Sequence, residues 1–331
     1  MTACRSLGLL AVLATACASP ESPVCSPNLA PDGIYPGYDY CSTARYPDFT
    51  DPDRRWDGSY PELCTGVTGE DAFACGEQLF WQVFQFDHDQ RKLAYDAMRV
   101  LVTQEEEAGT LDAQRLTRLN FRTGQLAVSL FAENGDTSPG AQVQRDLERA
   151  VELDPDHDVI IEAWLYTVKI NAAVVLGQDP TRYLDDLWAL AERDRAAVAG
   201  TVMGVAAGMS LDSGWPAFAV ELVDSIDLAD CSQYCTWEVH RAPFATTGQY
   251  FSYAEVQARS GHRARTLEFL ELARATPRYD AWPLRNVAET AYADVDGFMA
   301  RFSARTSDRP VTDLMLSGST QACMVCHAPL R

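Results

Sequence analysis

Lysine is almost absent from this chain of 331 residues, and basic side chains of any kind are few. Lys92 and Lys169 are the only lysines, and the 27 lysine and arginine side chains are outnumbered by 47 aspartates and glutamates. The formal net charge is −20. Because such a surface repels the phosphates of nucleic acids and the headgroups of anionic lipids, the composition argues against nucleic acid as a partner and against direct binding to an anionic membrane.

The sequence also lacks the short motifs that carry common enzyme chemistry. It has no phosphate-cradling glycine loop, dinucleotide fingerprint, nucleophile elbow or helix with paired zinc-binding histidines. The acidic run from Asp154 to Asp158 lacks the alternating ligand spacing of a calcium loop, and we interpret it as a turn between helices. We therefore predict no catalytic residue, and nothing in the sequence argues for an enzyme.

Apolar runs long enough to span a bilayer are missing, and a short run lies near the start of the chain. Leu7 to Ala16 is too short to span a bilayer but is typical of a signal-peptide core, with Arg5 before it. Small residues then lead into Cys17, an arrangement that resembles the processing box of bacterial lipoproteins. The resemblance implies that residues 1–16 are removed and that Cys17 carries acyl chains on the periplasmic face of a bacterial membrane. Ala18 in place of an aspartate favours the outer membrane, and an ordinary signal peptide is the alternative.

Eight cysteines remain besides Cys4 and Cys17, and an even number in an exported chain indicates disulfides. Spacing alone does not determine how they pair. Pairing between sequence neighbours would give Cys25–Cys41, Cys64–Cys75 and Cys231–Cys235. A zinc site is a disfavoured alternative, because oxidising conditions compete for the thiols; its ligands would be Cys231, Cys235, Cys323 and Cys326.

The most distinctive motif is Cys323-Met324-Val325-Cys326-His327, which resembles the haem-attachment motif of c-type cytochromes. In that motif the two thiols bind the vinyl groups of the porphyrin, and the histidine is the proximal ligand of the iron. The resemblance implies covalent haem on Cys323 and Cys326, with His327 bound to the iron. A second iron ligand would come from upstream, and the candidates are Met315, Met299, His240, His262 and His88. A Cys323–Cys326 disulfide beside a bystander histidine is the alternative.

Residues 17–69 are rich in both proline and aromatic side chains. Prolines at this density prevent regular helix and do not donate hydrogen bonds to a sheet. Seven aromatic residues between Tyr35 and Tyr60 are more than a disordered linker normally contains. We predict an irregular arm, which begins as a tether and becomes a disulfide-linked wrap on the folded body.

From Glu70 onward, apolar residues recur at helical spacing. Pairs of helical segments are interrupted at Gly135, Gly177, Gly214 and Gly261, which are 42, 37 and 47 residues apart. These intervals are near the period of paired-helix solenoids. The expected helices span 114–134, 141–153, 160–176, 183–192, 196–209, 217–228, 249–260 and 262–275, and one further helix reaches Phe302.

Two of these pairs resemble tetratricopeptide repeats residue by residue. Arg145 to Pro155 looks like the second helix and terminal proline of such a repeat. The pair around Gly261 places small, bulky and small residues in the corresponding positions: Ala254, Ala258, Thr266, Phe269, Leu270, Ala273 and Pro277. The resemblance covers roughly residues 112–304, and an unrelated helical bundle is the alternative. The resemblance implies a concave surface that binds peptides or other proteins.

The sequence thus predicts an all-α protein whose body, residues 70–304, is a tetratricopeptide-like α-solenoid. A signal peptide (1–16) and the arm (17–69) precede it, and a tail (305–331) carries the haem-like motif. The predicted function is that of a lipid-anchored, protein-binding scaffold in the cell envelope. The alternative is a mono-haem electron-transfer protein.

Overall fold

The computed structural model describes residues 64, 66–82, 88–134, 138–208, 213–225, 244–276 and 279–302. Within these ranges it contains twelve α-helices, one short 3-10 helix and no β-strand. The all-α prediction is confirmed for this part of the chain. None of the helices described is both long enough and apolar enough to cross a bilayer.

Most of the predicted functional residues lie outside the described ranges. The same holds for the arm up to residue 63, for the tail and for the predicted helix break at Gly135. The lipid anchor and the haem motif therefore stay predictions. The functional residues concerned are Cys17, Cys25, Cys41, Cys231, Cys235, His240, Met315, Cys323, Cys326 and His327.

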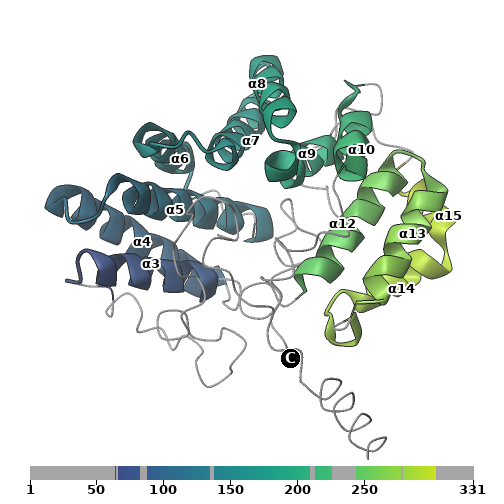
Figure 1. Ribbon diagram of the computed structural model, residues 1–331, viewed down its shortest axis with the longest axis horizontal. Coiled ribbons are helices and arrows are strands. Elements are labelled where there is room, and N and C mark those ends of the chain that lie inside the picture. The colour runs from purple at the N-terminus through teal and green to yellow at the C-terminus, as the bar shows by residue number, and fades with distance from the viewer. Residues whose placement is uncertain are drawn as a thin grey trace, which may run out of the picture.

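The helices follow one another along the chain (Figure 1). Those of the first half are α3 (Glu70–Gln82), α4 (His88–Ala108), α5 (Ala113–Asn134), α6 (Ala141–Leu153), α7 (Val159–Val175) and α8 (Thr181–Arg193). Those of the second half are α9 (Arg195–Gly208), α10 (Trp215–Ser225), α12 (Ala245–Arg259), α13 (Arg263–Arg274), η4 (Tyr279–Ala281), α14 (Arg285–Ala293) and α15 (Val295–Ala300).

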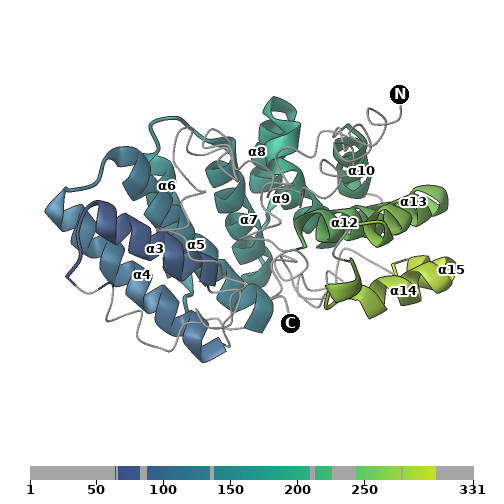
Figure 2. The same ribbon diagram turned by 60° about the horizontal axis from the view of Figure 1, so that its bottom comes forward.

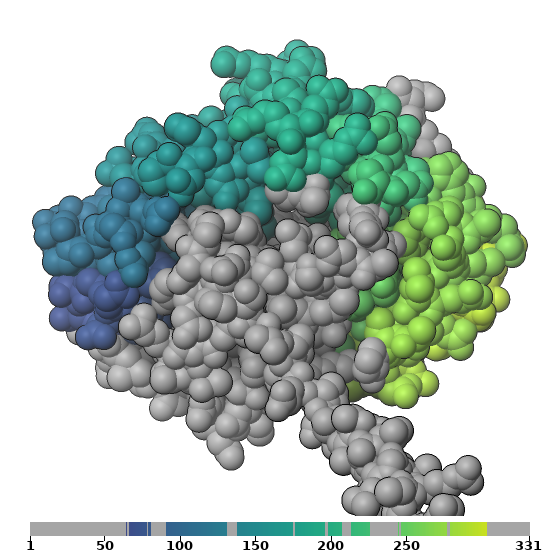
Figure 3. Space-filling view, in the orientation of Figure 1, coloured from purple at the N-terminus to yellow at the C-terminus, as the bar shows by residue number. Residues whose placement is uncertain are grey.

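Together the helices form an arc. The helices α3 to α6 make one end, α7 to α10 the middle, and α12 to α15 the other end (Figure 1). The turned view shows α12 and α13 beside α14 and α15 (Figure 2). In the space-filling view the surface runs without a break from purple α3 to yellow α15 along the outside of the arc (Figure 3).

Beyond contacts between chain neighbours, several contacts join alternate helices. Each helix packs on its neighbour along the chain, and between α3 and α13 the main contacts across an intervening helix are those of α3 with α5, α7 with α9, and α9 with α12, whereas α5 and α7 pack mainly through α6. In a curved stack the helices on the inside come closer together than those on the outside. We therefore call α3, α5, α7, α9 and α12 the inner helices, and α4, α6, α8, α10 and α13 the outer helices.

Helix α7 joins two hydrophobic cores. Ile161 and Leu165 belong to the core that α3 to α6 build, whereas Ala163 and Ile170 belong to the core of α8 to α15. A helix that is apolar on more than one side is buried between layers. The two halves of the arc therefore share one element.

Glycines end two of the helices as the sequence predicts. Gly261 follows α12 with a φ of +81°, a left-handed conformation that a Cβ atom disfavours. Its N–H donates to the Ala258 carbonyl at 3.2 Å, and the His262 N–H donates to the Gln257 carbonyl at 2.9 Å. This pair of bonds is the Schellman motif. Gly177, with a φ of +66°, ends α7 in the same manner.

The single helix expected up to Phe302 is wrong, because the structure has two helices there. The break falls at Asp294, between α14 and α15, where φ is −136° and ψ is 72°. The Asp294 carboxylate accepts a hydrogen bond from the Gly297 N–H at 2.9 Å and so caps α15. Apolar spacing alone could not show this break, because the two short helices continue nearly the same pattern.

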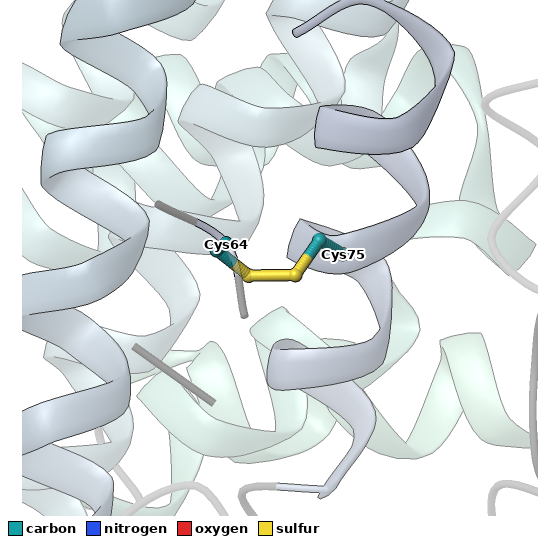
Figure 4. Close-up of a disulfide and its surroundings, with 2 residues drawn as sticks. All are labelled: Cys64 and Cys75. Carbon is teal, nitrogen blue, oxygen red and sulfur yellow. A yellow bond between two sulfur atoms is a disulfide. The ribbon is translucent and has the colours of Figure 1, made fainter. Parts of the chain in front are cut away.

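A disulfide joins Cys64 to Cys75 (Figure 4). Their Cα atoms are 5.8 Å apart, and Cys64 is buried in the first core. The bond ties the residue that precedes α3 to the second turn of that helix. Closing a loop of this length stabilises the folded chain by about 3 kcal/mol in chain-entropy accounts. Of the three pairs expected between sequence neighbours, this one lies within the described ranges.

Candidate functional site

Three of the candidate iron ligands lie in the described part of the chain. His262 is exposed at the turn between α12 and α13, where its Nδ1 lies 2.9 Å from Gln257 Oε1. Met299 of α15 packs against the second core, and His88 is the first residue of α4. In the described ranges no group of three or more histidine, cysteine, aspartate or glutamate side chains is placed to hold a metal ion.

The acidic run between α6 and α7 is a turn, as the sequence predicts. The two carboxylate oxygens of Asp154 accept hydrogen bonds from the backbone N–H groups of Asp156 and Asp158, at 3.0 and 2.6 Å. Asp158 in turn caps α7 by accepting from the Ile160 N–H at 2.8 Å. These carboxylates stabilise backbone amides, which is a structural role.

The inner helices bury charged residues that the sequence analysis did not single out. Glu77 of α3 and Arg118 of α5 are fully buried, and Arg122 of α5 is 2% exposed. Arg118 Nε lies 2.9 Å from Glu77 Oε1, and Arg122 Nε lies 3.3 Å from the same oxygen. The Arg122 guanidinium also lies 4.2 Å from the centre of the Phe80 ring. We call Glu77, Arg118 and Arg122 the α3–α5 charge cluster.

A second buried ion pair lies at the other end of the arc. Glu255 and Arg259, one turn apart on α12, are 1% and 7% exposed and form a salt bridge. The Arg259 guanidinium lies 4.4 Å from the centre of the Phe302 ring, which is a cation–π contact. Both ends of the inner row thus combine a buried carboxylate, an arginine and an aromatic ring.

These clusters could have been recognised from spacing, but only in part. Glu77 shares one face of α3 with Phe73 and Phe80, so the helical spacing predicts that it is buried. Arg118 and Arg122 are likewise four residues apart. Nothing in the sequence, however, connects Glu77 with two arginines about forty residues later. Because both clusters consist of ion pairs inside the protein, they position charge without placing a nucleophile beside a base.

Helix α9, in the middle of the inner row, has two glycines that no described side chain covers. Helix α9 packs against α7, α8, α10 and α12. On α9, Gly200 is exposed and Gly204 is half-buried. A Cβ atom added at either position would meet no described atom within 4 Å. We call the surface around Gly200 and Gly204 the α9 inner face; among the described residues no side chain stands in the way of a close backbone approach to these two glycines.

A separate cavity of about 340 Å³ lies between α4, α5 and α6. Its floor is polar, and its lining includes three arginines and four carboxylates. Asp146 is the buried carboxylate: Tyr95 Oη donates to it at 3.2 Å and Gln142 Nε2 at 2.6 Å. Burial raises the pKa of Asp146, although these hydrogen bonds and the nearby Arg99 lower it. Burial, together with the Asp146 carboxylate, also raises the pKa of Tyr95.

Comparison of the chain with protein-family models, with curated proteins and with solved structures finds no match.

Proposed function

We propose that this protein is an exported, lipid-anchored scaffold whose helical body is a tetratricopeptide-like solenoid that binds another protein along its inner helices. The anchor is acylated Cys17, which the sequence around it supports. An exported protein with such an anchor lies in the cell envelope, and Ala18 favours the outer membrane.

The observation that carries this proposal is the contact pattern of the inner helices. In a solenoid of helix pairs, the first helix of each pair packs on the first helix of the next pair and lines the concave side. The contacts of α3 with α5, α7 with α9 and α9 with α12 are of this kind, whereas α5 and α7 pack mainly through α6. The burial of Ala254, Phe269 and Ala273 at repeat-like positions of α12 and α13 also supports the proposal.

The α9 inner face is the part of the concave side that we assign to the partner. Its two glycines leave space for a partner segment, and helices on four sides hold it in place. Solenoids bind their partners on extended concave surfaces of this kind.

A photo-crosslinking amino acid tests this assignment. With p-benzoylphenylalanine at Gly200, we expect a discrete crosslinked product in cells that produce the full chain. The same residue at Ala189, which is exposed on the outer helix α8, should give none. Adding Gly204→Arg should abolish the product without lowering the melting temperature, because the new side chain enters open space. Equal products at both positions, or a product that survives Gly204→Arg, would contradict the proposal.

The second candidate function, electron transfer by a covalent haem, is supported by the motif Cys323-Met324-Val325-Cys326-His327. If it is correct, protein purified from a host with c-type haem maturation will show a Soret band that stays with the denatured polypeptide. The double variant Cys323→Ser/Cys326→Ser will lose that band, because both thioether bonds need a thiol. A colourless wild-type protein with a Cys323–Cys326 disulfide rejects this candidate.

A further inference from the structure

The cavity between α4, α5 and α6 has the size of a small-molecule site. Its volume of about 340 Å³ is at the lower end of the roughly 300–1,000 Å³ that ligand pockets occupy. Asn120 and Thr123 of α5 line it although both are almost fully buried, and Asp146 of α6 is 8% exposed. The cavity is therefore recessed into the protein, and it lies on the outer side of α5, away from the α9 inner face.

Most charges around the cavity are neutralised within the protein. Arg149 Nε lies 2.8 Å from Glu106 Oε1, and its Nη1 lies 3.4 Å from Glu152 Oε2. Lys169 Nζ lies 3.1 Å from Glu148 Oε1. These four side chains of the lining and Lys169 thus already have partners of opposite charge within the protein.

Three charged groups of the lining remain outside any ion pair with a described residue: Arg99 of α4, and Arg145 and Asp146 of α6. Gln142 separates the two on α6. Its Oε1 accepts from Arg145 Nε at 2.9 Å, while its Nε2 donates to Asp146 Oδ1 at 2.6 Å. The amide therefore holds a positive and a negative group apart at the cavity, and Arg99 adds a second positive group from the neighbouring helix.

This arrangement disfavours both a ligand that is only negatively charged and a ligand that is only positively charged. A simple anion would approach the two arginines but would be repelled by Asp146 and by the net charge of −20. A simple cation would approach Asp146 but would be repelled by Arg99 and Arg145. A zwitterion satisfies both signs at once, because its cationic and anionic groups are a fixed short distance apart.

We propose that the cavity between α4, α5 and α6 binds a free α-amino acid, with the ammonium group at Asp146 and the carboxylate between Arg99 and Arg145. Asn120 and Thr123 form the polar floor beneath it. Binding is coupled to the ionisation of Asp146, because an ammonium group stabilises the carboxylate and not the carboxylic acid. Affinity therefore falls as the pH drops through the raised pKa of Asp146. The charged and titratable groups facing Asp146 are Tyr95, Arg99 and Arg145.

The test is calorimetric titration of the full chain with each standard L-amino acid. We expect at least one to bind, and its N-acetyl and methyl-ester derivatives, which each lack one charge, to bind at least tenfold more weakly. Arg99→Gln and Asp146→Asn should each weaken binding at least tenfold, since each removes a hydrogen bond to a charged group. Arg182→Gln, on exposed surface of α8 outside the cavity, is the charge-matched control and should leave the affinity unchanged.

Two sets of results would overturn the proposal. The first is the absence of binding by every amino acid in the series. The second is binding of acetate or inorganic phosphate as tightly as the amino acid, or equal weakening by Arg182→Gln, which would make the ligand a simple anion or the effect one of net charge. Because Arg99 is exposed, Arg99→Gln gives a result even where Asp146→Asn fails to fold.

Discussion

Replacing Glu77 by leucine will lower the free energy of unfolding by about 3–5 kcal/mol, the range seen when one member of a buried ion pair is removed. The variant loses the carboxylate that both Arg118 and Arg122 contact, while their guanidinium groups stay in the protein interior. Leucine fills much of the space but cannot pair with a positive charge. Urea denaturation of wild type and variant measures the difference.

Two further variants separate charge from packing at this site. Glu107→Leu, on the exposed surface of α4, removes the same charge and should change stability by less than about 0.5 kcal/mol. The triple variant Glu77→Leu/Arg118→Met/Arg122→Met should regain much of the lost stability, because buried ion pairs can often be replaced by apolar side chains of similar volume. If Glu77→Leu and Glu107→Leu lose equally little, the α3–α5 charge cluster has no structural importance.

Gly124→Ala will also destabilise the protein, by about 1–3 kcal/mol. Helix α5 lies so close to α6 that a Cβ atom at Gly124 would stand 2.5 Å from Leu147 Cδ2 and 2.7 Å from Leu147 Cγ. Leu147 is fully buried and has little room to move, so the contact must be relieved by shifting the helices. This cost outweighs the roughly 0.5–1 kcal/mol that alanine gains over glycine inside a helix.

Gly200→Ala is the matched control for this substitution. It makes the same chemical change inside α9, where a Cβ atom meets no described atom within 4 Å. It should therefore raise stability by about 0.5–1 kcal/mol. Thermal unfolding of the two variants beside wild type gives opposite shifts if the close approach of α5 and α6 is real. A rise in melting temperature for both variants would contradict it.

Local sequence signals predicted the helices well and their exact ends less well. Helix α6 spans Ala141 to Leu153, as the apolar spacing and the following Asp154-Pro155 indicate. The glycine that ends α12 was found because a left-handed residue there needs no Cβ atom. The break at Asp294 was missed, because an aspartate acting as a helix cap looks like any polar residue on an exposed face.

The candidate sites were harder to predict, because they depend on contacts between helices distant in sequence. The α3–α5 charge cluster joins residues 41 and 45 positions apart, and the cavity needs side chains from three helices. Periodicity shows that Glu77 faces inward but not what it meets there. In the sequence Asp146 is one of many carboxylates in an acidic chain. Only the fold brings Tyr95 and Gln142 within hydrogen-bonding distance of it.

The position of α7 in both cores has a consequence for how the body unfolds. In an ideal repeat protein each unit contacts only its neighbours, so one end can open while the other stays folded. Here a single helix supplies Ile161 to one core and Ile170 to the other. Unfolding of either half exposes one side of α7 to solvent. The packing of α7 against the half that is still folded then becomes weaker. The described body should therefore behave as one cooperative unit, and a cut at α7 would leave two fragments that each lack a wall of their core.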